Sequence, residues 1–61
     1  MYAIQFRNVS DRDAVVRERG ITVQREYDDQ ADDSTWIEAA LTSEQNEALR
    51  TDKRVLYFSE L

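Results

Sequence analysis

The stretch Thr35-Trp36-Ile37-Glu38-Ala39-Ala40-Leu41-Thr42-Ser43-Glu44-Gln45 runs from a strand pattern straight into the start of a helix. Residues 35–41 alternate between two faces, which is the period of a strand with one buried side. The faces hold Ile37, Ala39 and Leu41 on one side and Trp36, Glu38 and Ala40 on the other. Thr42 and Gln45 then match a capping box, in which two side chains satisfy backbone amides at a helix start. The sequence therefore predicts a central strand followed by a helix over about residues 43–51.

On the C-terminal side, the predicted helix has few apolar residues, chiefly Ala48 and Leu49. A helix of this kind packs on a sheet through one narrow stripe. Residues 55–58 then form a β-branched and aromatic run, which favours a further strand.

On the N-terminal side, Tyr2, Ile4 and Phe6 alternate with other residues and predict a first strand. Ser10 offers a side-chain oxygen for an N-cap, so a helix is expected over about residues 11–19. Gly20 is the only glycine in the chain and stands where a helix end favours positive φ. We therefore interpret Gly20 as a helix stop.

Residues 21–27 resume an alternating pattern and predict a second strand, at an edge of the sheet. The predicted faces are Ile21, Val23 and Tyr27 on one side and Thr22, Gln24 and Glu26 on the other. Arg25 interrupts this alternation. Residues 28–34 contain four aspartates and no apolar period, so we expect a solvated connection between antiparallel strands.

In order, these elements predict an α+β domain of the ferredoxin-like βαββαβ type, a four-stranded antiparallel sheet with two helices on one face. Residues 1–61 are expected to form one domain, because a chain of 61 residues holds one modest core. The chain has no Cys and no His, so neither disulfides nor a zinc site of the usual kind is expected to brace it.

The composition also argues against several function classes. A formal net charge of −5 disfavours binding to a phosphate backbone, so nucleic acid is not an expected partner. The aspartates of residues 28–33 lack the spacing and central glycine of a calcium loop, and there is no His to activate a serine. We therefore expect no enzyme activity, no catalytic residue, no metal site and no cofactor.

The chain shows no apolar run long enough for a signal peptide or a membrane span. A soluble protein, cytoplasmic as the sequence stands, is the expectation, with secretion after removal of a leader as the alternative. The absence of cysteine fits either compartment.

The helices of this fold cover one side of the sheet and leave the other side open. The predicted open face holds Ala3, Gln5, Thr22, Gln24, Trp36, Glu38 and Ala40, with either Leu56 and Phe58 or Val55 and Tyr57. An aromatic ring exposed on a sheet face often marks a protein interface, because it supplies buried area at little entropic cost. Trp36, Glu38 and Gln24 are therefore candidate protein-binding residues. The alternative is that Trp36 packs along its neighbours or belongs to the core in another register.

Three segments together carry a resemblance to a known family. They are residues 2–7 (YAIQFR), 17–27 (RERGITVQREY) and 40–58 (ALTSEQNEALRTDKRVLYF). In their order and spacing they resemble the inhibitory propeptide domain of subtilisin-like serine proteases and the free-standing propeptide-like protease inhibitors. The resemblance spans nearly the full chain, although the family's turn before the last strand often holds Asp-Pro where this chain has Asp52 and Lys53.

In that family the open sheet face packs on two surface helices of the protease, acidic residues cap those helices, and a C-terminal tail lies in the active-site cleft. The resemblance therefore implies a stand-alone inhibitor or chaperone-like folding helper of a subtilisin-like serine protease. It assigns docking to Trp36, Glu38 and Glu60, and cleft contacts to Phe58 and Leu61. Only residues 59–61 follow the predicted last strand, so either residues 58–61 leave the sheet to reach the cleft or the chain does not inhibit in the family's manner.

Two other hypotheses stay open. The chain could be a small acidic protein of viral or mobile-element type that binds and modulates a non-protease host protein. It could also form a homodimer through the open face, because pairing two such faces would bury Trp36.

Overall fold

The computed structural model describes residues 1–29 and 34–61, and its elements follow the predicted order. The elements are β1 (Tyr2–Phe6), α1 (Val9–Arg19), β2 (Val23–Asp29), β3 (Ser34–Ala39), α2 (Ser43–Arg50) and β4 (Val55–Glu60). All strand pairs are antiparallel, and the sheet order is β2-β3-β1-β4. The predicted ferredoxin-like fold is therefore confirmed, with β3 inside the sheet and β2 at an edge.

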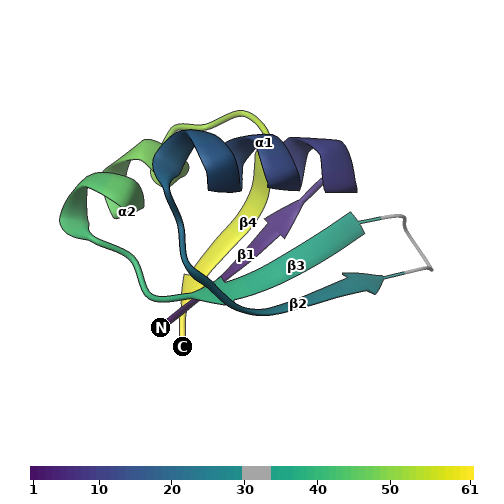
Figure 1. Ribbon diagram of the computed structural model, residues 1–61, viewed down its shortest axis with the longest axis horizontal. Helices are drawn as coiled ribbons and strands as arrows, with labels where there is room; N and C mark the ends of the chain where they lie inside the picture. Colours follow the sequence, from purple (N-terminus) through teal and green to yellow (C-terminus); the bar gives the residue numbers. More distant parts are fainter. Residues whose placement is uncertain (30–33) are drawn as a thin grey trace.

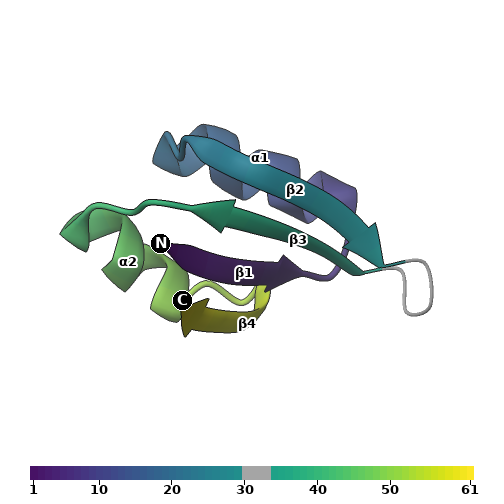
Figure 2. The same ribbon diagram turned by 90° about the horizontal axis from the view of Figure 1, so that it is seen from below.

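The domain has two layers. Both helices lie on one side of the sheet, and the described chain leaves the other side uncovered (Figure 1). In the view from below, the sheet order can be followed from β2 to β4, with α1 behind β2 (Figure 2). The uncovered side is the surface that the sequence predicted as an open face.

The core lies between the helices and the two inner strands. Ile4 and Phe6 of β1 and Ile37 of β3 have no exposed surface, and Leu49 is the α2 side chain that joins them. The cluster also contains Val15, Ile21 and Ala39. Burying a large apolar side chain stabilises a fold by about 1.5–3 kcal/mol. Because this core has few such side chains, we expect the free energy of unfolding to be small. The predicted narrow stripe of α2 is confirmed at Leu49.

Helix α1 begins earlier than predicted. Asn8 is its N-cap, and the Asn8 Oδ1 accepts a hydrogen bond from the Asp11 backbone N–H at 2.8 Å. The prediction of Ser10 at this position is wrong, because Asn and Ser cap about equally well and the chain offers both. At the other end Gly20 takes a φ of 62°, and its N–H donates to the Val16 carbonyl. Gly20 is confirmed as the helix stop.

The predicted capping box of α2 is present. The Thr42 Oγ1 accepts from the Gln45 N–H at 3.1 Å, and the Thr42 N–H donates to the Gln45 Oε1 at 2.9 Å. The Gln45 Nε2 also donates to the carbonyls of Arg19 and Gly20, at 2.9 and 3.2 Å. One side chain therefore caps the start of α2 and satisfies carbonyls at the end of α1.

Strand β2 contains a bulge at Gln24. Val23 pairs with Ala39 and Arg25 pairs with Glu38, so Gln24 is an additional residue between two regular pairs. The bulge accounts for the interruption that Arg25 makes in the sequence pattern. Beyond it, each residue of β2 lies on the opposite side from that expected of an unbroken alternation.

The bulge therefore changes which side of the sheet the apolar and charged residues of β2 occupy. Tyr27 lies opposite Trp36 on the open side, whereas Glu26 and Asp28 lie toward α1. The predicted sides of Tyr27 and Glu26 are wrong, because a period of two holds only along a regular strand.

The predicted antiparallel pairing of β2 and β3 is confirmed, but the predicted bounds of the connection between them, residues 28–34, are wrong at both ends. Asp28 and Asp29 belong to β2 and Ser34 begins β3, and the two strands pair antiparallel. The rest of that connection, residues 30–33, lies outside the described residues.

A buried arginine joins α1 to the acidic side of β2. The Arg12 Nη1 donates to the Thr35 Oγ1 at 2.9 Å and to the Asp28 Oδ1 at 3.3 Å, and Nε donates to the Asp13 Oδ1 at 3.1 Å. Nη2 lies 3.9 Å from the Glu26 Oε2. These partners satisfy a charge that would otherwise oppose folding, because a buried ion is tolerated only when it is paired.

A second arginine ties the turn before β4 to α1. Arg54 donates two hydrogen bonds of 3.0 Å to the Glu18 carboxylate and bonds of 3.0 and 2.8 Å to the Asp52 carboxylate. The hydrogen bonds from Arg54 lower the pKa of both Asp52 and Glu18 below their ordinary values. The same bonds raise the pKa of Arg54 above its ordinary value.

Candidate protein-binding surface

The strand register places one side chain from each strand in a line across the open face: Tyr27 from β2, Trp36 from β3, Gln5 from β1 and Tyr57 from β4. The Tyr27 and Trp36 rings stack with centroids 6.2 Å apart, and the Trp36 and Tyr57 rings meet edge to face at 5.8 Å. Tyr27 and Tyr57 are 41% and 51% exposed, and Trp36 is half-buried. We call Tyr27, Trp36 and Tyr57 the aromatic row.

The aromatic row has an ordered support. Strands β3 and β4 are separated by β1, so their backbones stand about 9–10 Å apart and the Trp36 and Tyr57 rings must lean together above Gln5. The Gln5 Nε2 donates to the Ser34 Oγ at 2.8 Å, which fixes the amide. The Trp36 and Tyr57 rings contact each other across the intervening strand.

A second line of residues runs beside the aromatic row and holds Arg25, Glu38, Ala3 and Ser59. The Arg25 Nη1 lies 3.9 Å from the Glu38 Oε2, and the Arg25 guanidinium lies 5.4 Å from the centroid of the Tyr27 ring. Ala3 and Ser59 have short side chains, and Ala3 is only 8% exposed, so the surface is lower there than along the aromatic row. We call Ala3 and Ser59 the low strip. The open face thus offers rings, a lower strip beside them and a carboxylate.

The structure brings together two of the residues predicted from the sequence. Trp36 and Glu38 lie on the open face, so the alternative that placed Trp36 in the core is wrong. Gln24 is exposed but sits at the bulge, and it belongs to neither line of the open face.

A second bulge decides which residues of β4 face outward. Val55 pairs with Phe6 and Tyr57 pairs with Gln5, which leaves Leu56 as the additional residue. The sequence predicted that either Leu56 and Phe58 or Val55 and Tyr57 lie on the open face, and neither pair lies there together. Tyr57 lies on the open face, whereas Val55 and Phe58 lie on the helix side.

The residues assigned to a protease cleft are paired with the rest of the sheet. The Phe58 ring stacks on the Tyr2 ring at 5.2 Å and packs against the core. The Leu61 N–H donates to the Met1 carbonyl at 2.9 Å. Glu60, which was assigned to docking, pairs with Tyr2 of β1, so the register does not place it on the open face. The Leu61 side chain is 67% exposed. Residues 58–61 would have to leave the sheet before they could enter a cleft.

The sequence predictions did not place Tyr27 or Arg25 on the open face, and they left Tyr57 there as one of two alternatives. Tyr27 and Arg25 reach it because of the bulge at Gln24, and Tyr57 reaches it because of the bulge at Leu56. The one sequence signal of the first bulge is the break in alternation at Arg25. Nothing comparable marks the second bulge, because residues 55–58 are all apolar or aromatic.

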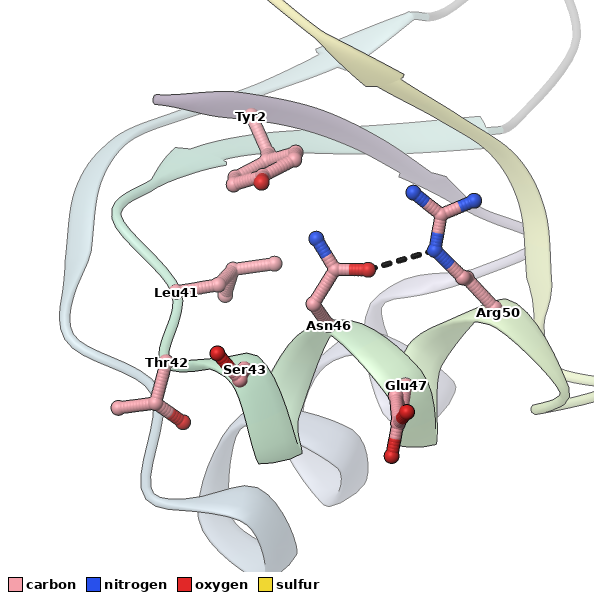
Figure 3. A pocket seen from close by; sticks show the side chains of 7 residues that line it. All are labelled: Tyr2, Leu41, Thr42, Ser43, Asn46, Glu47 and Arg50. Atoms are coloured by element: carbon pink, nitrogen blue, oxygen red, sulfur yellow. Dashed lines mark hydrogen bonds between the residues drawn. The ribbon is translucent and has the colours of Figure 1, made fainter.

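Of the hollows near α2, one of about 280 Å³ is lined by Glu18, Arg19, Thr42, Glu44, Gln45 and Ala48. Two others share Arg50. The larger, of about 380 Å³, is lined by Tyr2, Leu41, Thr42, Ser43, Asn46, Glu47 and Arg50 (Figure 3). The Arg50 Nε donates to the Asn46 Oδ1 at 2.6 Å there. The second, of about 260 Å³, lies between α2 and β4 and is lined by Leu49, Arg50, Val55, Leu56, Tyr57 and Phe58. Arg50 borders both hollows.

In residues 1–29 and 34–61, no three His, Cys, Asp or Glu side chains gather to hold a metal ion. Neither described helix has the length and apolar character of a membrane span. No family model matches the chain, and comparisons with curated proteins and with solved structures give no match.

Proposed function

We propose that this chain is a protein-binding domain without catalytic function, which docks on a folded partner through its open sheet face. The aromatic row is the observation that carries the proposal. Tyr27 and Tyr57 are about half exposed on a bare sheet face, on either side of Trp36. Rigid tyrosine and tryptophan rings lose little entropy on binding and are the residues most often found at the energetic centres of interfaces.

The shape of the open face favours a helical partner. The low strip of Ala3 and Ser59 runs beside the aromatic row, so an element of the partner can lie along the strip with its flank against the rings. Glu38 stands in the same line, and its side chain is 25% exposed. A carboxylate in that place suits the N-terminus of a helix, which carries unpaired N–H groups and positive dipole charge.

The resemblance described above supplies the class of partner: a subtilisin-like serine protease whose surface helices meet the open face. The fold, the uncovered face and the position of Glu38 support this assignment. Because residues 58–61 are held in the sheet, docking through the open face is the primary contact in this proposal and the cleft contact is secondary.

The test measures inhibition and assisted refolding of several subtilisin-like proteases by the purified chain. We expect the wild type and Val9→Ala to act alike, because Val9 is an exposed apolar residue of α1 away from the open face. Trp36→Ala should reduce the effect by about tenfold or more, as expected of a central aromatic residue in an interface.

Two outcomes would contradict the proposal. Wild-type chain without effect on the activity or the refolding of any protease would rule out the protease as partner. Sedimentation that finds a dimer of the wild type, and a monomer of Trp36→Ala, would show that the open face binds a second copy instead.

A further inference from the structure

The two edges of the sheet differ in how they are protected against further strand pairing. Edge strand β2 has a bulge in its first half and then the charged residues Arg25, Glu26 and Asp28. Bulges and charges are the usual means by which a protein blocks an exposed edge. Edge strand β4 has its bulge at Leu56, before a regular stretch from Tyr57 to Glu60.

The backbone of β4 directs unpaired groups outward. The Leu61 N–H donates to the Met1 carbonyl, and the register is regular from there to the pair of Gln5 and Tyr57. In an antiparallel ladder, pairs that exchange hydrogen bonds alternate with pairs that do not. Phe58 and Glu60 therefore point their N–H and C=O groups away from β1, toward the free edge.

A hollow adjoins this edge on the side of α2. Its volume is about 260 Å³, and Leu49, Val55, Leu56 and Phe58 contribute apolar side chains to it. Such a hollow is large enough for one apolar side chain of a strand laid along β4. Alternate side chains of an added strand would reach it, because they project to one side of the sheet.

Arg50 is the one charged residue among the described residues that line the hollow, in a chain of net charge −5. The Arg50 guanidinium lies 5.3 Å from the centroid of the Phe58 ring, and its Nε bonds to the neutral Asn46 side chain. Within residues 1–29 and 34–61, no carboxylate pairs with Arg50 or with Lys53, which precedes β4. These cations favour an acidic ligand over a neutral or a basic one.

We propose that the β4 edge binds an extended acidic peptide as a fifth strand of the sheet. Phe58 and Glu60 supply the backbone hydrogen bonds, an apolar side chain of the peptide fills the hollow, and a carboxylate two residues away, on the same side of the added strand, binds Arg50. A second copy of the chain is the competing occupant of this edge, and sedimentation tests for it below. The hollow shares Tyr57 with the open face proposed above, but Trp36 is not among its lining residues.

The probe is the fluorescein-labelled peptide Thr-Val-Thr-Glu-Thr-Glu, whose valine and two acids share one side of a strand, compared by fluorescence anisotropy with the same peptide carrying lysine for both acids. The full chain should bind the acidic peptide at least about tenfold more tightly than the lysine peptide. Arg50→Gln should weaken binding of the acidic peptide by about threefold to tenfold and should leave the lysine peptide unaffected or slightly favoured. Trp36→Ala should bind both peptides as the wild type does.

Two variants at one position test the backbone contact. Glu60→Pro removes an N–H that points away from β1, whereas Glu60→Ala keeps that N–H and removes the same side chain. We expect Glu60→Pro to bind the acidic peptide about fivefold or more weakly than Glu60→Ala, with similar thermal melting. If Glu60→Pro does not fold, the two peptides and Arg50→Gln decide the outcome.

Three results would overturn the proposal. The first is no binding of the acidic peptide at about 1 mM, and the second is equal binding by folded Glu60→Pro and Glu60→Ala. The third is a wild-type dimer in sedimentation that Glu60→Pro dissociates and the peptide does not, because the edge would then be occupied by a second copy.

Discussion

Trp36 and Tyr57 stand on strands that do not touch each other, yet their rings meet at 5.8 Å and 61° above the intervening strand β1. The contact depends on the bulge at Leu56, which brings Tyr57 rather than Phe58 to the open face. The two neighbours in sequence therefore have opposite roles.

We expect Tyr57→Ala and Phe58→Ala to differ in stability and in binding. Phe58 packs against the core and on Tyr2, so its truncation should lower the free energy of unfolding by about 2 kcal/mol or more. Tyr57→Ala loses one ring contact and should cost no more than about 1 kcal/mol, but it should weaken docking through the open face. Urea unfolding of both variants measures the first difference, and equal losses would contradict the register of β4.

Arg12→Ala should lower the free energy of unfolding by about 2 kcal/mol. The substitution removes a buried donor from Thr35 and Asp28. The loss stays moderate because the Asp28 and Glu26 side chains are 59% and 60% exposed and regain water. Arg17→Ala, at an exposed position of the same helix, is the matched control and should change stability by about 0.5 kcal/mol or less. Similar losses of unfolding free energy in the two variants would show that the Arg12 contacts do not stabilise the fold.

Stability should fall as the pH drops through the acidic range. Arg54 lowers the folded-state pKa of Glu18 and Asp52 below their ordinary values of 4.5 and 3.8. Their contribution is therefore complete above about pH 5 and is lost as the pH falls through the lowered values. The Tm of Asp52→Asn should depend less on pH between pH 2 and pH 7 than the Tm of the wild type does. The variant should therefore melt further below the wild type at neutral pH than at pH 2. Parallel curves for the two proteins would contradict this account.

Gly20→Ala should lower the free energy of unfolding by about 1–2 kcal/mol through backbone strain alone. Gly20 has a φ of +62°, and a methyl group added there meets no atom within 4 Å. Gly20→Asn should cost less, because Asn adopts this conformation more readily than Ala does. An equal loss of Tm in both variants would indicate that something other than the left-handed conformation is disturbed.

The regular parts of the fold could be predicted from the sequence because each depends on local chemistry. The alternation at Tyr2, Ile4 and Phe6, the capping box of Thr42 and Gln45 and the stop at Gly20 act within a few residues. Those signals sufficed for the order of elements and for the existence of an open face.

The make-up of the open face could be predicted only in part. Trp36 and Glu38 lie on the regular strand β3, and the sequence pattern placed them correctly. Tyr27 and Tyr57 follow bulges, whose positions depend on pairing with strands far away in sequence. The choice between Asn8 and Ser10 as N-cap likewise depends on how the chain leaves β1, which local chemistry does not decide.

The hydrogen bond from Leu61 to Met1 has a mechanical consequence. It joins the end of β4 to the start of β1, so both ends of the described chain lie at the same end of one antiparallel pair (Figure 1). A force that pulls residues 1 and 61 apart acts along the hydrogen bonds, which run perpendicular to the strands, and loads them one after another. The sheet should therefore unzip at low force from this corner, with β4 peeling away from β1 before β2 and β3 separate.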